Sequence, residues 1–400
     1  MKKTKDVFLN IMTYVCASFG FIILITLLMF IFKNGMKLLS FDLLKDDYFE
    51  TVYNVKIDDS RNFRLGGFSN PQISDGYFSP RWGIVLQDDE NNDHEHIVVI
   101  AYISEQSPFR NVIYVSDDTK TELQVGYKIS KMTMTNENED YICALAKNKA
   151  EAMIANLEEA TLITDMIATT GGEGIRGSLL TTFYLIGLTL FISLPLGISG
   201  AIYLHEYAKK NKLMEIIRVM IDMTSGIPSI IFGLVGAIIF IPFMNKVISS
   251  TGGSIASGAL TLSIILLPII IKTTEESLKV IPHSYRMASL ALGASRTQTT
   301  FKIVLPNALS GILTATLLSI GRIIGESAAL IYAVGTAIKD TAIINEKSTS
   351  LAVHIWSLMS GENPNYELAC AISIIILIVV ALISIGVKII SKKVNKMEIN

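Results

Sequence analysis

Long apolar stretches alternate with polar loops along most of the chain. A membrane-spanning helix needs about 20 mostly apolar residues, because the hydrocarbon core of a bilayer is about 30 Å thick and each helical residue rises about 1.5 Å. The first of these stretches is too long for a signal peptide, and no small-residue cleavage pattern follows it, so we expect it to be an anchor. The pattern predicts an all-α, multi-pass membrane protein with six transmembrane helices. The six stretches lie near 11–32, 179–204, 229–247, 255–271, 309–334 and 368–390.

The distribution of Lys and Arg predicts how these helices are oriented. Basic residues gather before the first stretch, after the sixth, and in the loops at 205–228 and 272–308, whereas the segment at 33–175 holds more acidic than basic residues. Loops rich in Lys and Arg stay on the cytoplasmic side of a membrane. We therefore expect both termini in the cytoplasm and the segment 48–165 outside it, in a protein of the cell membrane.

Composition narrows the class further. Half of the 400 residues are hydrophobic and 18% are charged, and the mean hydropathy is +0.47, values that do not fit a soluble protein. The formal charge of −2 shows no basic excess, so we expect no nucleic-acid partner. The three scattered cysteines form neither a disulfide framework nor a metal-binding pair. No GxxxxGK[ST], GxSxG or HExxH motif occurs, so we expect no catalytic residue, no metal site and no cofactor in this chain.

Residues 48–165 form a polar insertion with a different pattern. Short segments at 82–86, 97–103, 111–115 and 123–134 are typical of strands, and the alanine-rich segment 141–155 predicts a helix. The insertion is long enough for a small domain of its own. We therefore predict an inserted β-rich domain.

Three motifs in this insertion resemble those of a PDZ domain. They are RWGIVL at 81–86, SPF at 107–109 and VGYKI at 125–129, although PDZ domains have Gly-Asp where this chain has Gly126-Tyr127. The resemblance implies that the end of another chain could add a strand to an exposed edge beside 83–86. An unrelated β-rich insertion without a ligand is an equal alternative. The candidate peptide-binding loop comprises Trp82, Gly83, Ile84 and Val85.

The polar loop between the fourth and fifth apolar stretches is predicted to be helical in pieces. A helix at 273–280 is ended by Ile281-Pro282, and a short amphipathic helix at 284–292 is ended by Gly293. The sequences RMASLALGA at 286–294 and IVLP at 303–306 resemble the EAA loop of ABC-importer permeases, whose coupling helix sits in a groove of the ATPase subunit. Here Met287 stands where that family usually has Glu. The resemblance assigns the coupling role to Arg286, Met287, Ala288, Ser289, Gly293 and Pro306.

Three further segments resemble the permeases of phosphate importers of the PstA type. They are YLHEYA at 203–208, GIPSIIFG at 226–233 and GRIIGESAAL at 321–330. The resemblance covers about 170–391 and implies the type I ABC-importer fold and transport of inorganic phosphate. It implies three protein partners: a PstC-like permease, a dimer of PstB-like ATPases that bind ATP and Mg, and a PstS-like phosphate-binding protein. The lipid bilayer is a further partner, expected from the apolar stretches. The alternatives are a permease for sulfate or molybdate, and a PDZ-containing membrane sensor or protease-associated protein.

The domain boundaries follow from these patterns. We expect an N-terminal transmembrane helix at 1–47, the insertion at 48–165, the permease domain at 170–391 with its coupling loop at 273–306, and a cytoplasmic tail at 392–400.

Two charged residues interrupt the fifth apolar stretch. Arg322 and Glu326 would each be unfavourable by roughly 2.5–3.5 kcal/mol at the bilayer centre, so a buried or water-lined partner is expected. They are four residues apart on a helix and can pair. Either the pair lines the translocation path, where Arg322 meets the anion and Glu326 holds it when the path is empty, or it is a salt bridge that locks two helices together. Arg218 is a candidate second cation of the path, or an interfacial charge.

Overall fold

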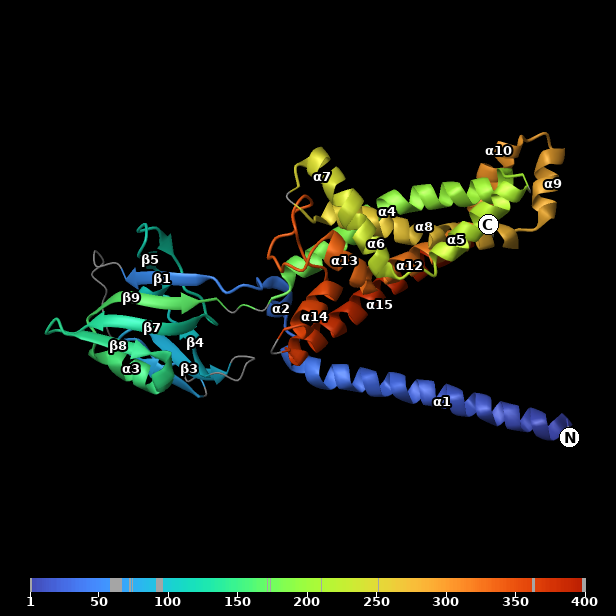
Figure 1. The fold of residues 1–400 in the computed structure, drawn as a ribbon. Coiled ribbons are helices and arrows are strands. Elements are labelled where there is room, and N and C mark those ends of the chain that lie inside the picture. Colours follow the sequence, from blue (N-terminus) through green and yellow to red (C-terminus); the bar gives the residue numbers. More distant parts are fainter. Residues whose placement is uncertain are drawn as a thin grey trace. The chain divides into compact units, whose positions relative to one another are not determined.

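The computed structural model divides the chain into two compact units (Figure 1). A helical unit comprises Met1–Lys45 and Ile175–Asn400, and a sheet unit comprises Asp46–Gly174. The predicted limits of the insertion, 48 and 165, fall inside the sheet unit. Parts of the predicted insertion, at 58–66 and 91–95, and of the predicted tail, at 398–400, lie outside the described residues. The structure describes residues 2–57, 67–71, 73, 75–90, 96–170, 172, 174–209, 211–250, 252–361 and 364–397.

The helical unit is built from long helices joined by short ones. Its first part contains α1 (Lys2–Gly35), the 3-10 turn η1 (Met36–Leu38) and α2 (Phe41–Lys45). Three π-helical turns interrupt the rest, namely η4 (Tyr203–Tyr207), η5 (Gly236–Phe240) and η6 (Thr300–Val304). The remaining helices are α4 (Arg176–Ile202), α5 (Lys212–Thr224), α6 (Ser229–Val235), α7 (Ile241–Ile248), α8 (Ile255–Val280), α9 (His283–Ala291), α10 (Arg296–Thr299), α11 (Leu305–Asn307), α12 (Leu309–Gly325), α13 (Ala328–Ala333), α14 (Leu351–Met359) and α15 (Tyr366–Met397).

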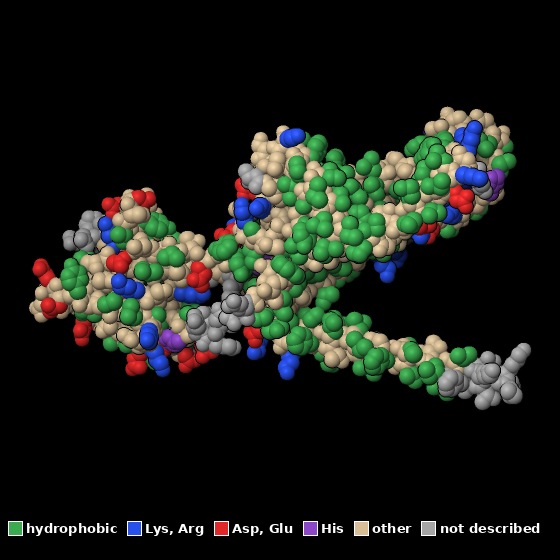
Figure 2. All heavy atoms as spheres, in the orientation of Figure 1, with side chains coloured by type: hydrophobic (Ala, Val, Ile, Leu, Met, Phe, Trp, Pro, Cys, Tyr) green, Lys and Arg blue, Asp and Glu red, His purple; other side chains and the backbone are tan. Residues whose placement is uncertain are grey.

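Five helical segments in the described ranges are long and apolar enough to cross a membrane. On the face that Figure 2 shows, the charged side chains of the helical unit gather mainly toward its two ends, with hydrophobic side chains between them, as expected for a unit whose middle faces lipid. Each of the five overlaps one of the predicted stretches. They are Leu9–Leu38, Arg176–Tyr207, Ser229–Ile248, Ile255–Val280 and Tyr366–Lys392.

The predicted helix at 309–334 is wrong as a continuous element. Helix α12 ends at Gly325, Glu326 has extended backbone angles (φ −83°, ψ 118°), and α13 begins two residues later. At its other end, α12 is bent by 63° from the segment Arg296–Asn307, so a sixth crossing is counted only if this bent pair forms one span. The hydropathy of the stretch is unaffected by such breaks.

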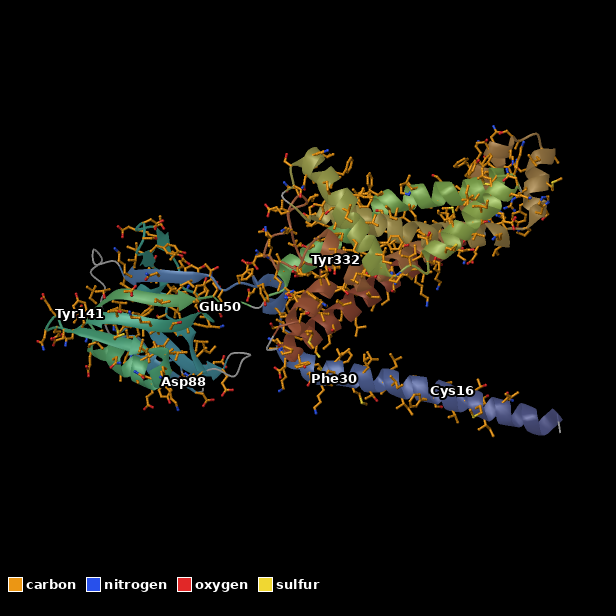
Figure 3. All side chains as sticks on the ribbon, viewed as in Figure 1. Cys16, Phe30, Glu50, Asp88, Tyr141 and Tyr332 are labelled. Atoms are coloured by element: carbon orange, nitrogen blue, oxygen red, sulfur yellow. The ribbon has the colours of Figure 1, made fainter. Side chains whose placement is uncertain are left out.

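Helices α4 and α8 pack along each other and form the core of the helical unit together with α12 and α15. A Cβ added to Gly197 of α4 would lie 2.5 Å from Cγ2 of Ile270 in α8, so this glycine lets the two helices approach closely. Helix α1 meets α15 near Gly35, but none of its apolar window is buried by the rest of the chain. Its exposed side chains, among them Cys16 and Phe30 (Figure 3), are therefore left for lipid or a partner.

The sheet unit contains one antiparallel sheet of nine strands and a single longer helix, α3 (Lys149–Glu159), within the described residues. The strands follow the order β2-β3-β4-β7-β9-β1-β5-β6, and β8 pairs with β7. The core of this unit contains residues of both the helix and the sheet, and its large, fully buried side chains include Trp82, Phe109, Met132, Met153 and Leu157. The strands are β1 (Val52–Ile57), β2 (Gly76–Ser79), β3 (Ile84–Glu90), β4 (His96–Ile103), β5 (Val112–Tyr114), β6 (Lys120–Thr121), β7 (Lys128–Thr135), β8 (Tyr141–Leu145) and β9 (Leu162–Thr169), and the 3-10 turns are η2 (Pro108–Arg110) and η3 (Ala146–Asn148).

The predicted helix at 141–155 is wrong in its first half. Residues Tyr141–Leu145 form β8, which pairs with β7 from Thr135 to Lys131, and the helix begins only at Lys149. Tyr141 is strongly exposed on this strand (Figure 3). Pairing with a neighbouring strand outweighs the helix propensity of the alanines here.

Candidate functional site

The charged residues predicted in the fifth apolar stretch lie at the break between α12 and α13. The Arg322 Nη2 atom lies 3.2 Å from the Glu326 Oε2 atom. The other carboxylate oxygen of Glu326 accepts the backbone N–H of Ala329 at 3.3 Å, so this carboxylate joins the end of α12 to the first turn of α13. The Glu326 side chain is 4% exposed, whereas that of Arg322 is 48% exposed. The glutamate is thus fixed by the fold, and the guanidinium is left facing outward from the chain.

This ion pair lies within a single stretch of chain. Arg322 and Glu326 are four positions apart, and the hydrogen bond from Ala329 extends the contact into α13. Its two predicted roles, lining the translocation path and locking helices together, both stay predictions.

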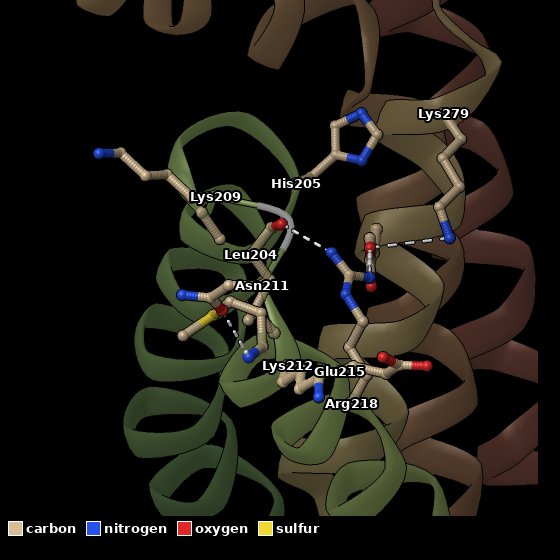
Figure 4. A pocket seen from close by; sticks show the side chains of 11 residues that line it. Leu204, His205, Lys209, Asn211, Lys212, Glu215, Arg218 and Lys279 are labelled. Carbon is tan, nitrogen blue, oxygen red and sulfur yellow. Dashed lines mark hydrogen bonds and ion pairs between the residues drawn. The ribbon is translucent and has the colours of Figure 1, made fainter.

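Arg218 makes its contacts elsewhere. It lies on α5 and pairs with Glu275 of α8, and its Nη2 atom donates to the Leu204 carbonyl oxygen at 2.7 Å (Figure 4). These groups line a pocket of about 730 Å³, whose lining does not include Arg322. In Figure 4, Lys209 extends away from Arg218, whereas Lys279 lies 3.7 Å from the Glu275 oxygen that Arg218 also contacts. The structure brings Arg322 and Glu326 together but gives Arg218 a different set of partners.

The predicted coupling loop folds into a compact hairpin of short helices. Helix α9 begins after Pro282, and the chain reverses at Gly293, whose φ of +85° is a conformation that favours glycine. Ser295 then caps α10 by accepting the Gln298 N–H, with the Gln298 side chain returning to the Ser295 N–H. Pro306 occupies the first turn of α11. The motif glycine and proline thus mark the turn and the last short helix of this loop.

The side chain of Arg286 is buried within the loop and does not lie on its outer surface. Its Nε and Nη2 atoms donate to one Glu206 carboxylate oxygen at 3.2 and 2.8 Å. The same guanidinium donates to the carbonyl oxygens of Ile281 and Leu278, at 2.9 and 3.1 Å. Both side chains of the ion pair are largely buried. A buried, hydrogen-bonded guanidinium of this kind fixes geometry between segments.

The other predicted coupling residues divide between the two faces of the loop. Ser289 faces inward and shares a hydrogen bond of 2.9 Å with Thr299. Met287, Ala288 and Gly293 are exposed. Together with Leu292, which is 90% exposed, they give the loop an apolar outer surface. Such a surface at the tip of a charged loop is typical of a protein contact.

Glu206 is the site residue that the sequence reasoning missed. It occurs in the segment at 203–208, whose resemblance to PstA-type permeases names no partner for it, and Arg286 lies 80 positions away. A signal was present, because a carboxylate in the last turn of a helix lies at the negative end of the helix dipole and needs a nearby cation.

The candidate peptide-binding loop is occupied by the sheet unit itself. Strand β2 pairs with β3 from Tyr77↔Leu86 to Ser79↔Ile84, so the edge expected to be free beside 83–86 is filled. The N–H groups of Arg81, Trp82 and Gly83 are bonded internally, to the Glu158 carboxylate, the Ser79 hydroxyl and the Ser79 carbonyl oxygen. The expectation of an open edge is therefore wrong, because the chain supplies its own strand and its own carboxylate there.

Within the described ranges, no group of three or more His, Cys, Asp or Glu side chains lies close enough to hold a metal ion.

Comparison with known proteins places these features in context. The sequence model of the family described as "Binding-protein-dependent transport system inner membrane component" matches residues 193–396. The chain is 33% identical over 228 residues to the probable ABC transporter permease protein YqgI of Bacillus subtilis, covering 54% of this chain and 76% of that protein. It is 33% identical over 186 residues to the phosphate transport system permease protein PstA of Haemophilus influenzae, covering 46% of this chain and 63% of that protein. It is 31% identical over 227 residues to PstA of Pasteurella multocida, covering 55% and 78%.

One solved structure that resembles the chain is an inward-facing form of the MetNI methionine ABC transporter. The match has a TM-score of 0.43 and 24% sequence identity, and it covers 55% of this chain and 95% of that chain.

Proposed function

The chain belongs to the family of binding-protein-dependent transport system inner membrane components, and from this premise we propose that it is the permease subunit of an ATP-driven importer of inorganic phosphate. The observation that carries the proposal is the run of PstA relatives at 31–37% identity. The segments with PstA-like motifs and the coupling loop all lie at 203–330. The sheet unit lies before the matched range 193–396. A membrane sensor or protease-associated protein would need no loop of this kind.

The proposed topology has six crossings in a type I ABC-importer fold. The bent segment Arg296–Asn307 with α12 would then count as one crossing. Both termini and the loop around α9 would lie in the cytoplasm, and the sheet unit would lie outside the cell membrane. The Lys and Arg distribution supports this orientation.

The proposed assembly contains the partners that such a permease needs. A PstC-like permease would complete the path, a PstS-like protein would deliver phosphate, and a dimer of PstB-like ATPases would bind ATP and Mg. The apolar outer surface of the coupling loop, with Met287 and Leu292 exposed, supports docking to the ATPase. Movement of that loop would switch the path between its two open states.

Within the path, we assign contact with the anion to Arg322. Its guanidinium is half exposed, it presents several N–H donors in a fixed plane, and Glu326 beside it is held by the helix break. Arginine suits oxyanions because its donors match their geometry. Glu326 would keep the guanidinium in place when the path is empty. We assign Arg218 a structural role instead, because it joins α5 to Glu275 of α8 and to the Leu204 carbonyl oxygen at the end of α4.

The test is transport by the purified complex in proteoliposomes. Phosphate, presented by the binding protein, should stimulate ATP hydrolysis, and sulfate should not. Equal stimulation by sulfate would move the substrate to another oxyanion, and no associated ATP hydrolysis would refute the importer.

Arg322→Ala should lower phosphate uptake by about 10- to 100-fold, since a hydrogen bond to a charged group contributes about 1.5–3 kcal/mol. The matched control is Lys339→Gln, because Lys339 also pairs with a glutamate, Glu346 at 2.6 Å, but lies outside α12. Normal uptake by assembled Arg322→Ala complex would refute the assignment of Arg322.

A further inference from the structure

The long helix α4 ends in a wide π-helical turn, Tyr203–Tyr207, that is buried on one side. The Ala208 N–H closes this turn by donating to the Tyr203 carbonyl oxygen at 2.8 Å. The last carbonyl groups of a helix have no partner within the helix. Those of Leu204 and Glu206 are instead engaged by side chains from other segments.

Three arginines from three separate segments converge on this turn. Arg218 of α5 donates to the Leu204 carbonyl oxygen at 2.7 Å (Figure 4). Arg286 of α9 donates twice to the Glu206 carboxylate. Arg296, the first residue of α10, donates to the Glu206 carbonyl oxygen and lies 5.5 Å from the centre of the Tyr207 ring. Cations stabilise the C-terminal end of a helix, so each of the three contacts favours this turn.

Two of these arginines also reach the end of α8. Arg218 pairs with Glu275, and Arg286 donates to the carbonyl oxygens of Leu278 and Ile281. The ends of α4 and α8 are therefore joined to α5 through one guanidinium and to α9 through another. The Arg286–Glu206 pair joins the turn at the end of α4 to α9, the helix that is predicted to dock on the ATPase. Displacement of α9 would have to carry the end of α4 with it.

We propose that the Arg286–Glu206 ion pair is the positioning contact that transmits movement of the coupling loop to α4 and α8. This proposal rests on the proposed function, because it needs a motor that moves the loop. The role of the two residues is to make α9 and the Tyr203–Tyr207 turn move as one body, so that ATP hydrolysis by a partner is converted into a change of the path.

A nearby ion pair provides the contrast. Lys272 of α8 and Asp222 of α5 lie 3.0 Å apart, and both side chains are more than half exposed. This pair also joins two helices at the same end of the unit, but it touches neither the turn nor α9. Its loss should have little effect, since exposed ion pairs contribute little.

The experiment compares three variants in the reconstituted complex: Glu206→Gln, Arg286→Lys and the control Asp222→Asn. The quantities measured are the amount of assembled complex, ATP hydrolysis, and phosphate taken up per ATP hydrolysed. Glu206→Gln should assemble and hydrolyse ATP but take up about tenfold less phosphate per ATP, a change within the range by which single substitutions alter coupling between sites. Arg286→Lys, which keeps the charge but loses the planar fork, should lower the same ratio by a smaller factor. Asp222→Asn should leave it unchanged.

A purely structural role for the pair would lower assembly, hydrolysis and uptake in parallel and leave the ratio unchanged. An unchanged ratio in assembled Glu206→Gln would overturn the proposal. If Glu206→Gln does not assemble, an unchanged ratio in Arg286→Lys overturns it instead. Wild-type complex without any substrate-linked ATP hydrolysis would refute the proposed function itself, whatever the variants do.

Discussion

A buried histidine on α14 makes the stability of the helical unit depend on pH. His354 is fully buried, and its Nδ1 atom lies 2.9 Å from the Ser178 hydroxyl of α4. Burial lowers the pKa of His354 from its ordinary value of 6.5 to about 4. The folded unit therefore keeps this imidazole neutral at pH values where the unfolded chain would protonate it.

The sign and size of the effect follow from this difference. A lowered folded-state pKa gives stability that is fully present above pH 6.5 and is lost as the pH falls toward 4. Each pKa unit corresponds to about 1.36 kcal/mol, so the full loss is about 3 kcal/mol, and about 2 kcal/mol of it has occurred at pH 5. For a unit of this size, that loss lowers the melting temperature by about 4–8 °C between pH 8 and pH 5.

The assay is thermal unfolding of the purified chain in lipid nanodiscs, followed by tryptophan fluorescence. Trp356 lies two residues from His354 on α14 and reports the helical unit. His354→Gln should abolish most of the change between pH 8 and pH 5. His283→Gln should retain it, because the His283 side chain is exposed to solvent on α9. Equal pH slopes in the wild-type protein and in His354→Gln would refute the reasoning.

Two further substitutions test close contacts in the two units. Gly177→Ala should lower the melting temperature of the helical unit, because the new Cβ would lie 1.7 Å from the Lys339 carbonyl oxygen. The control Gly187→Ala, in the same helix, places its Cβ in open space and should raise stability by up to about 1 kcal/mol. Equal effects of the two substitutions on thermal unfolding would contradict the packing. Glu158→Gln should destabilise the sheet unit by about 1–3 kcal/mol, because its carboxylate satisfies donors of a buried loop. Denaturant unfolding of the full chain, followed by tryptophan fluorescence, measures this loss, and an unchanged midpoint would show that the carboxylate contributes nothing there.

The apolar stretches could be predicted because each depends on a continuous run of local sequence. The break at Glu326 could not be predicted in this way. A single glutamate within an apolar run changes the mean hydropathy little, although at the break its carboxylate accepts the Ala329 N–H. The error at 141–155 has the opposite origin. There the alanines indicate a helix, but the chain can pair with β7 over Tyr141–Leu145, and pairing between strands is decided by the neighbour.

The candidate site divides in the same way. Arg286, Gly293 and Pro306 could be found by motif, because their spacing is local. The partner of Arg286 could not be found, since Glu206 lies at the end of a different helix and only the folded chain brings the two together. For the candidate loop at 82–85, the resemblance to a PDZ domain stays a prediction. The strand that pairs beside this loop precedes the motif in sequence, and the carboxylate that bonds to it follows the motif. The motif itself therefore could not reveal them.

Position 287 is a methionine, where the EAA loop that it resembles usually has a glutamate. The arrangement of charged and apolar side chains in the predicted coupling loop accounts for this difference. Met287 is 54% exposed beside Leu290 and Leu292, so the outer surface here is apolar. Arg286 of the same loop points inward, and the Glu206 carboxylate neutralises its charge. A contact built from this surface would gain its free energy from burial of apolar area and would depend little on salt. The inward ion pair would then supply the rigidity that a surface of flexible methionine and leucine side chains lacks.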